Sequence, residues 1–421
     1  MRISEQRRVT SPSSPVSNRP RKHAPDYWLL LITVALLAIG LVVVYSISPA
    51  LAVGKGVDGS TYVTRQVIAI VIGLIMFFVA SRIPMEVWKQ LAKPLLGLAA
   101  IATIITLLLP VNADYPAHRW IRIGGFSFQS VELLKFALII GVAGFLVQRM
   151  KQNQIHDFKA TIQPLVITLG VVGFVVAGLQ SDLGSAAVIM AILVGMIFVA
   201  GAPLARLGMI VAGVLVLGAL FIGTSEYRRE RVATFLNPSI ECADTASGYQ
   251  ACQAMIAVGS GGMSGLGLGN SVQAYGYLPE AENDSIFAIY AEKFGFLGVA
   301  LLLGLLGALY ARIRLVAVNA ADDFSRLVVL GILVWLSVQA LVNIAAMLGM
   351  IPLKGITLPL ISYGGSSVLM ILAALGVVFH VSRYTHFSNG RNSSVRRETD
   401  ESSRYGRRVR GTYHTPLGSR R

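Results

Sequence analysis

The sequence predicts an all-α, polytopic membrane protein with about ten transmembrane helices and a large extracytoplasmic loop between helices 7 and 8. Three observations predict this fold. The chain of 421 residues is 54% hydrophobic and only 14% charged, whereas a soluble domain has about 25% charged residues. Apolar runs long enough to cross a bilayer recur along the chain. These runs are continuous rather than alternating, which favours helices over a membrane barrel.

Each long apolar run is taken as one span. An even number of crossings places both termini on one side, and the basic tails assign that side to the cytoplasm. Residues 112–130, 225–284 and 349–366 are then expected outside. The expected spans are residues 27–49, 65–81, 92–111, 131–149, 162–180, 183–201, 207–224, 285–311, 327–348 and 367–382.

One membrane domain, residues 27–384, is expected between two tails, residues 1–26 and 385–421. The tails are rich in Ser, Pro, Gly and Arg and poor in apolar residues, a composition typical of disorder. Much of the net charge of +15 lies in the tails. It indicates cytoplasmic anchoring near anionic membrane lipids, and no nucleic-acid partner is expected.

Basic residues on the predicted outer face depart from the positive-inside rule. As a set near one membrane face, they suggest an anionic ligand. The alternative is that they bind lipid headgroups or pair with Glu226 and Glu230. The residues that carry this prediction are Arg119, Arg122, Arg228 and Lys354.

Both cysteines, Cys242 and Cys252, fall in the long outer loop. A disulfide is permitted outside the cytoplasm, and this pair would close a small loop. No CxxC motif and no nearby histidine accompany them, so they are not expected to form a metal site. We predict a structural disulfide.

Glu132, Lys135 and Asp182 are charged residues within or beside the predicted spans. Glu132 and Lys135 are three residues apart and therefore share a helix face. A charge at the bilayer centre costs about 2.5–3.5 kcal/mol, so such residues usually pair or line a cavity. Either this pair holds helices together or it shapes a polar cavity. Asp182 either contributes to such a site or caps the next helix.

The stretch LPEAENDSIF (278–287) places three carboxylates before the eighth span. Glu280 and Glu282 are expected in solvent. Asp284 is nearest to the apolar run, where partial burial would raise its pKa and suit it to act as a general base. The alternative is an N-cap for a helix that starts at Ser285.

The most specific motif of the chain is NIAAMLGMIPLKGITLPLISYGGSS (343–367), preceded by HRWIRIGGFSFQSVELLK (118–135) and LQSDLGSA (179–186). These motifs, in this order, resemble those of the SEDS family of polytopic peptidoglycan polymerases. Lys354 favours resemblance to the division type, FtsW, over the elongation type, RodA. Ser181 departs from the family pattern, which has proline before the aspartate.

The resemblance implies a peptidoglycan glycosyltransferase. Such an enzyme polymerises lipid II, a disaccharide-pentapeptide on undecaprenyl pyrophosphate, into β-1,4 glycan at the outer face of the cytoplasmic membrane during septal synthesis and cell division. Asp284 matches the family's essential aspartate and is the predicted catalytic residue. The predicted substrate-binding residues are Arg119, Arg122, Glu132, Lys135, Asp182, Arg228, Lys354 and Ser366.

The resemblance also implies partners, namely a class B penicillin-binding transpeptidase and other division proteins. No cofactor is required by it, and the sequence leaves open whether a divalent cation, Mg or Mn, assists the leaving group. Two rival functions stay open. One is a lipid-linked oligosaccharide flippase or cation-coupled carrier, because intramembrane charges often mark ion paths. The other is a noncatalytic division scaffold.

Overall fold

The computed structural model describes residues 23–110, 118–123, 126–223, 246–352 and 355–385, with isolated residues between 229 and 235. The predicted tails lie outside these ranges except for residues 23–26 and 385. Of the predicted site residues, Arg228, Lys354 and Cys242 also lie outside them.

Each predicted span corresponds to a helix in the described part of the chain. Eight of these helices are long and apolar enough to cross a membrane, and α6 and the apolar part of α7 are shorter. The all-α polytopic prediction is therefore confirmed. The helices are α1 (Tyr27–Lys55), α2 (Thr61–Ala80), α3 (Met85–Leu108), α4 (Ser130–Lys151), α5 (Gln163–Gly173, extended by π-helical turns Phe158–Ile162 and Phe174–Leu179), α6 (Leu183–Val199), α7 (Leu204–Gly223), α11 (Ile286–Val318), α12 (Asp323–Met347) and α13 (Gly365–Val381, followed by a 3-10 turn, Ser382–Tyr384).

Short polar residues set several helix ends. Asp26 caps α1 by accepting hydrogen bonds from the backbone amides of Trp28 and Leu29. Asp322 caps α12 through the amide of Ser325. These carboxylates satisfy amides that have no partner in the first helical turn.

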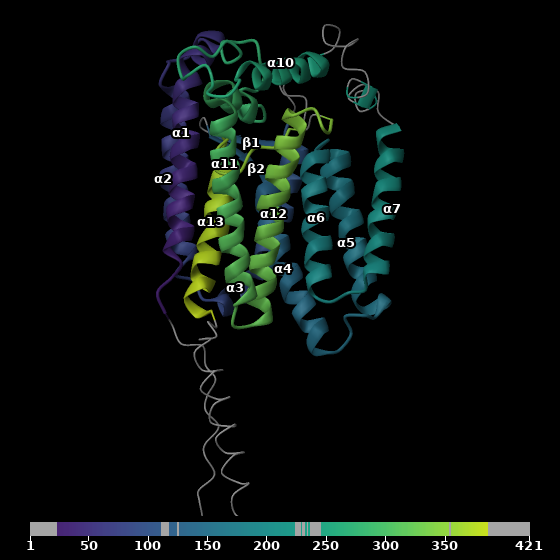
Figure 1. Cartoon of the computed structure of the whole chain (residues 1–421). Coiled ribbons are helices and arrows are strands. Elements are labelled where there is room, and N and C mark those ends of the chain that lie inside the picture. The colour runs from purple at the N-terminus through teal and green to yellow at the C-terminus, as the bar shows by residue number, and fades with distance from the viewer. Residues whose placement is uncertain are drawn as a thin grey trace, which may run out of the picture. The chain divides into compact units, whose positions relative to one another are not determined.

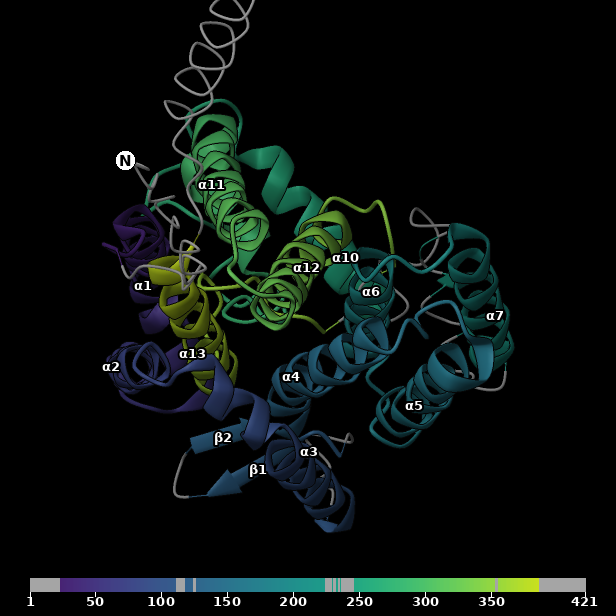
Figure 2. The ribbon, with the colours of Figure 1, turned by 90° about the horizontal axis from the view of Figure 1, so that it is seen from below.

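Helices α4 and α13 lie inside the bundle and are its most buried spans. Seen along the helices, α4 lies between α3 and α13 on one side and α6 and α12 on the other, and α5 and α7 lie at the edge (Figure 2). Helices α13 and α2 approach closely because Gly376 faces the α2 backbone. A methyl group at Gly376 would lie 2.4 Å from the carbonyl oxygen of Phe77.

One end of the bundle carries additional structure (Figure 1). It consists of α10 (Ala246–Ser260) and an antiparallel hairpin, β1 (Trp120–Ile123) paired with β2 (Phe126–Gln129). The hairpin was not predicted. It lies immediately before α4, so it fixes the point at which the chain enters that buried helix.

Helix α11 is broken at Gly295, whose backbone angles are φ 62° and ψ −165°. The glycine-rich segment 261–267 fills the break. The amide of Leu266 donates to the Glu292 carbonyl at 2.9 Å, and the amide of Phe296 donates to the Gly262 carbonyl at 2.9 Å. A methyl group at Gly295 would lie 2.3 Å from the amide nitrogen of Gly265. Only glycines permit this close backbone contact.

Candidate active site

Asp284 directly precedes α11, at the end of the bundle that carries α10 and the hairpin (Figure 1). The N-cap of α11 is Ser285, and its side chain makes no capping hydrogen bond. The structure thus assigns the N-cap position of α11 to Ser285 rather than to Asp284. The Asp284 side chain is partly buried, and its backbone carbonyl accepts a hydrogen bond from Asn343 Nδ2 at 2.7 Å.

The segment that carries Asp284 is fixed by the loop between α12 and α13. Ser362 Oγ donates to the carbonyl of Asn283 at 2.7 Å, and the amide of Tyr363 donates to the carbonyl of Glu282 at 2.9 Å. These contacts hold the backbone immediately before Asp284, which limits the freedom of the carboxylate before any ligand binds.

Arg119 and Asp284 converge on Gly355. A methyl group at Gly355 would lie 3.1 Å from Asp284 Oδ2 and 3.5 Å from Arg119 Nη1. The guanidinium is held by its other nitrogens, since Nε donates to the Gln180 carbonyl at 3.0 Å and Nη2 donates to the Ser181 carbonyl. A carboxylate and a cation are therefore directed to one point, and the missing side chain of Gly355 leaves them room.

The turn that holds Arg119 explains one departure from the family pattern. Ser181 has φ 56°, whereas a proline ring fixes φ near −65°. The backbone of this chain thus takes a path at Ser181 that proline could not follow. The serine carbonyl is directed at the Arg119 guanidinium as a result.

Arg122 lies on β1 opposite Ser127 and is exposed. Its position on the hairpin leaves it accessible from outside the bundle, in contrast to the partly buried Arg119.

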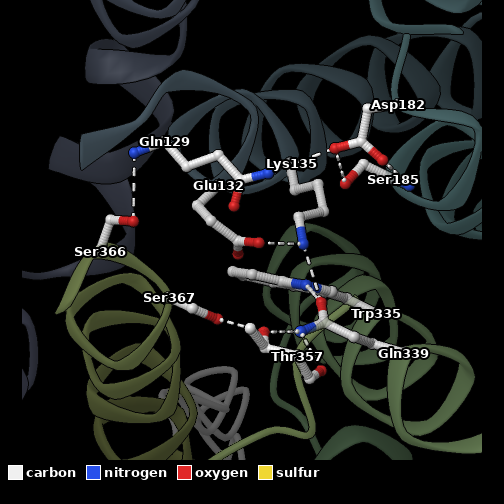
Figure 3. A network of polar contacts seen from close by, with 10 residues as sticks. All are labelled: Gln129, Glu132, Lys135, Asp182, Ser185, Trp335, Gln339, Thr357, Ser366 and Ser367. Carbon is white, nitrogen blue, oxygen red and sulfur yellow. Dashed lines mark hydrogen bonds and ion pairs between the residues drawn. The ribbon is translucent and has the colours of Figure 1, made fainter. Parts of the chain in front are cut away.

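Glu132 and Lys135 form a buried ion pair on α4 (Figure 3). Lys135 Nζ lies 2.7 Å from Glu132 Oε1, and the two residues are 1% and 3% exposed. Lys135 also donates to Gln339 Oε1 on α12 at 2.8 Å. The pair therefore joins α4 to α12. This agrees with the expectation that the two charges hold helices together. Glu132 Oε2 has no hydrogen-bond partner among the described residues.

Asp182 is the N-cap of α6, and its Oδ1 accepts from the amide of Ser185 at 3.0 Å. The capping alternative is thus confirmed for this residue. Its Oδ2 accepts a hydrogen bond from the side-chain Nε2 of Gln129 at 3.2 Å. The backbone amide of Gln129 donates to Ser366 Oγ at 3.1 Å (Figure 3). Asp182 and Ser366 consequently belong to one buried polar chain between α6 and α13.

Glu282 is 3% exposed, so the expectation that it lies in solvent is wrong. The carboxylate lies near Tyr363, which packs edge-on against Tyr62 of α2. Burial raises the pKa of the Tyr363 hydroxyl above its ordinary value, and a hydrogen bond with the Arg65 side chain opposes that increase. The cause of the error is tertiary, because Tyr363, which is distant in the sequence, packs at Glu282 and donates its backbone amide to the Glu282 carbonyl.

Sequence reasoning missed two buried charges in α11, Glu292 and Lys293. Glu292 accepts hydrogen bonds from Ser271 Oγ at 2.6 Å and from the amide of Val272 at 2.9 Å. Lys293 Nζ donates to the Leu268 carbonyl at 2.8 Å. Adjacent charges inside an apolar run were the available signal, since such charges are costly unless they have partners.

The described residues do not form a conventional metal site. Within the described ranges, no group of three or more His, Cys, Asp or Glu side chains is arranged to hold a metal ion. Cys252 is disulfide-bonded, while Cys242 lies in the part of the loop that is not described.

The fold and the site define a multi-pass helical membrane protein that directs an acid and a cation to one end of its bundle. The chain belongs to the FtsW/RodA/SpoVE family of cell cycle proteins, whose family pattern matches residues 27–387.

Named relatives are similar over most of their length. The probable peptidoglycan glycosyltransferase FtsW of Coxiella burnetii is 38% identical over 368 residues, covering 86% of this chain and 96% of the relative. Stage V sporulation protein E of Bacillus subtilis is 37% identical over 373 residues, which cover 87% of this chain and 99% of the relative.

Solved structures share the fold. A chain from a structure described as structural coordination of polymerization and crosslinking by a peptidoglycan synthase complex has a TM-score of 0.68 and 29% identity, covering 86% of this chain and 98% of that one. The rod shape determining protein RodA of Thermus thermophilus has a TM-score of 0.61 and 26% identity, and the match covers 86% of this chain and 99% of that one.

Proposed function

We propose that this protein is a peptidoglycan glycosyltransferase that polymerises lipid II into β-1,4 glycan strands at the outer face of the cytoplasmic membrane. In this proposal both termini are cytoplasmic, and the enzyme acts at the division septum. A class B penicillin-binding transpeptidase and other division proteins are its partners. The name of the Coxiella burnetii relative supports the reaction class.

The observation that carries the proposal is the convergence of Asp284 and Arg119 on Gly355. Glycosyl transfer from a diphosphate-linked sugar needs a base for the acceptor and a cation for the leaving group. A carboxylate and a guanidinium beside one glycine supply both. They lie at the end of the bundle, where a sugar displayed outside the bilayer can reach them.

In the proposed reaction, Asp284 accepts the proton of the 4-hydroxyl of the acceptor sugar. The hydroxyl oxygen attacks C1 of the donor sugar and forms the new glycosidic bond. The bond between C1 and the pyrophosphate oxygen breaks, and undecaprenyl pyrophosphate leaves with the bonding electrons. Attack opposite to the leaving group converts an α-linked donor into a β-linked product, so no covalent enzyme intermediate is needed.

The departing diphosphate is stabilised by cations in this proposal. Arg119 is the nearest described candidate, and its fixed guanidinium suits it because little rearrangement is needed when charge develops. The exposed Arg122 binds the diphosphate or the lipid headgroup region as it approaches. Arg228 and Lys354 are proposed to complete the cationic set.

The remaining predicted residues support the binding site. Glu132 and Lys135 shape the polar interior below the site through their contact with α12. Asp182 and Ser366 hold the start of α4 against α6 and α13 through Gln129. Their proposed contribution to substrate binding is thus to maintain the polar surface that the donor meets.

The test is polymerisation of lipid II by purified Asp284→Asn protein, with Glu280→Gln as the matched control. Glu280 lies in the same segment, but its side chain is exposed. We expect Asp284→Asn to lower the polymerisation rate by at least about a hundredfold, in line with the contribution of general-base catalysis. Glu280→Gln should polymerise at nearly the wild-type rate. Undiminished polymer from folded Asp284→Asn protein would reject the base assignment.

A flippase is the second candidate, favoured by the buried Glu132–Lys135 pair. The two functions need their key carboxylate in different places, since a carrier uses one near the midplane of its spans. Asp284 precedes α11 rather than lying within it, which supports the enzyme. Transfer of labelled lipid across vesicles without formation of polymer would favour the flippase.

A further inference from the structure

Two side-chain amides on α12, Gln339 and Asn343, are one helical turn apart and are almost completely buried. Both face the segment 355–357, which includes Gly355. Neither is needed to close the backbone hydrogen bonds of α12. Buried amides are costly unless they have partners, so the identity of their partners indicates what they do.

Asn343 connects this segment to the backbone of Asp284. Its Nδ2 donates to the Asp284 carbonyl at 2.7 Å and to the Ile356 carbonyl at 2.6 Å. Both neighbours are acceptors, which fixes the nitrogen, rather than the oxygen, on this side of the amide. One nitrogen therefore bridges the chain that carries the carboxylate and the chain that carries Gly355.

Gln339 connects the same segment to the ion pair on α4. Its Oε1 accepts from Lys135 Nζ at 2.8 Å and from Trp335 Nε1 at 2.8 Å. Its Nε2 donates to the Thr357 carbonyl at 3.1 Å (Figure 3). The neighbours again fix the amide orientation, because the oxygen faces two donors and the nitrogen faces an acceptor.

We propose that Gln339 and Asn343 are positioning residues that link the Glu132–Lys135 ion pair to the Asp284 carboxylate through segment 355–357. The inference rests on the proposed function, in which Asp284 is the base. The ion pair keeps a fixed position because separating two buried charges is unfavourable. Through their hydrogen bonds, the two amides restrict the movement of Asp284 relative to the ion pair, and they do so without contacting the substrate.

The first test is the steady-state kinetics of lipid II polymerisation by Asn343→Ala. Loss of the bridge lets Asp284 shift, so we expect kcat to fall about tenfold to a hundredfold, with KM unchanged within about twofold. Ser337→Ala is the matched control. Ser337 also lies on α12, but its hydroxyl only donates to carbonyls of its own helix, so its kcat should match the wild type.

The second test measures coupling with a double-mutant cycle. Glu132→Gln with Lys135→Met removes the ion pair without leaving one buried charge. It is combined with Asn343→Ala. If the alanine variant does not fold, it is combined with the milder Thr357→Val, which removes the hydroxyl that accepts from Gln339 Nε2 at 3.2 Å. If the amides transmit the position of the ion pair, the combined loss of kcat should fall short of the product of the separate losses by at least about fivefold.

Either of two results overturns the proposal: wild-type kcat in a folded bridge variant, or a combined loss equal to the product within about twofold. Asp284→Asn is measured in the same assay, which separates the two hypotheses. An active Asp284→Asn protein would reject the base, whereas an inactive one with an additive cycle would reject only the positioning role.

Discussion

At the scale of single residues, the site depends on the absence of a side chain as much as on charged groups. Asp284 and Arg119 lie on either side of the position where a side chain at Gly355 would begin. The Asp284 backbone is held by Asn343 on α12, and the Arg119 guanidinium is fixed to the turn before α6.

Gly355→Ala should therefore impair catalysis more than folding. The methyl group would displace the Asp284 carboxylate by a few tenths of an ångström, whereas Arg119 Nη1, at 3.5 Å, would lie at an ordinary contact distance. We expect the rate of lipid II polymerisation to fall about tenfold to a hundredfold. Melting of the detergent-solubilised protein should change by only a few degrees. Wild-type kinetics in the alanine variant would show that this close approach has no role in the reaction.

At the scale of elements, the break in α11 joins the outer loop to the bundle. Segment 261–267 makes backbone hydrogen bonds to both sides of Gly295, and Glu292 and Lys293 bind the following residues, 268–273. The chain then continues to Asp284. The break thus determines the path of the segment that carries the proposed base.

Gly295→Ala should destabilise the protein, whereas Gly304→Ala in the same helix should not. Position 295 combines a positive φ with an extended ψ, a region that is essentially restricted to glycine and costs other residues about 1–3 kcal/mol. The new methyl group would also collide with the Gly265 amide. No atom lies within 4 Å of a methyl group at Gly304. Thermal unfolding in detergent should show a lower melting temperature for Gly295→Ala alone. Equal melting temperatures for both variants would contradict a structural role for the break.

At the scale of the whole molecule, the helices alternate in direction, so their connections gather at two ends. The hairpin, α10 and Asp284 share one end, and the turns around residues 152 and 200 lie at the other (Figure 1). The proposed enzyme requires the first end to face outward, because its lipid-linked donor is displayed there.

Cysteine labelling should reveal this orientation. Glu280 and Gln152 are exposed at opposite ends, so Glu280→Cys and Gln152→Cys form a matched pair. In intact spheroplasts, a maleimide that cannot cross the membrane should label position 280 and leave position 152 unlabelled. Both positions should react after the membrane is permeabilised, which controls for access. The opposite pattern would place Asp284 inside the cell and exclude the proposed reaction.

The sequence by itself determined the number and approximate limits of the spans, because a bilayer requires a fixed length of continuous apolar helix. It also identified Asp284 and the Glu132–Lys135 pair, since charges beside or within such helices are unusual. It did not identify the hairpin or the break at Gly295. These depend on backbone contacts between distant segments, which hydrophobic length does not encode.

Only the tertiary structure decided which polar groups meet. It placed Arg119 beside Asp284, covered Glu282, and joined Lys135 to Gln339, a residue 204 positions away in the chain. The physical reason is that apolar length fixes where a helix crosses, while the packing of helix faces fixes its neighbours. A charged residue within an apolar span indicates that a partner exists. The packing of the helices determines which residue that partner is.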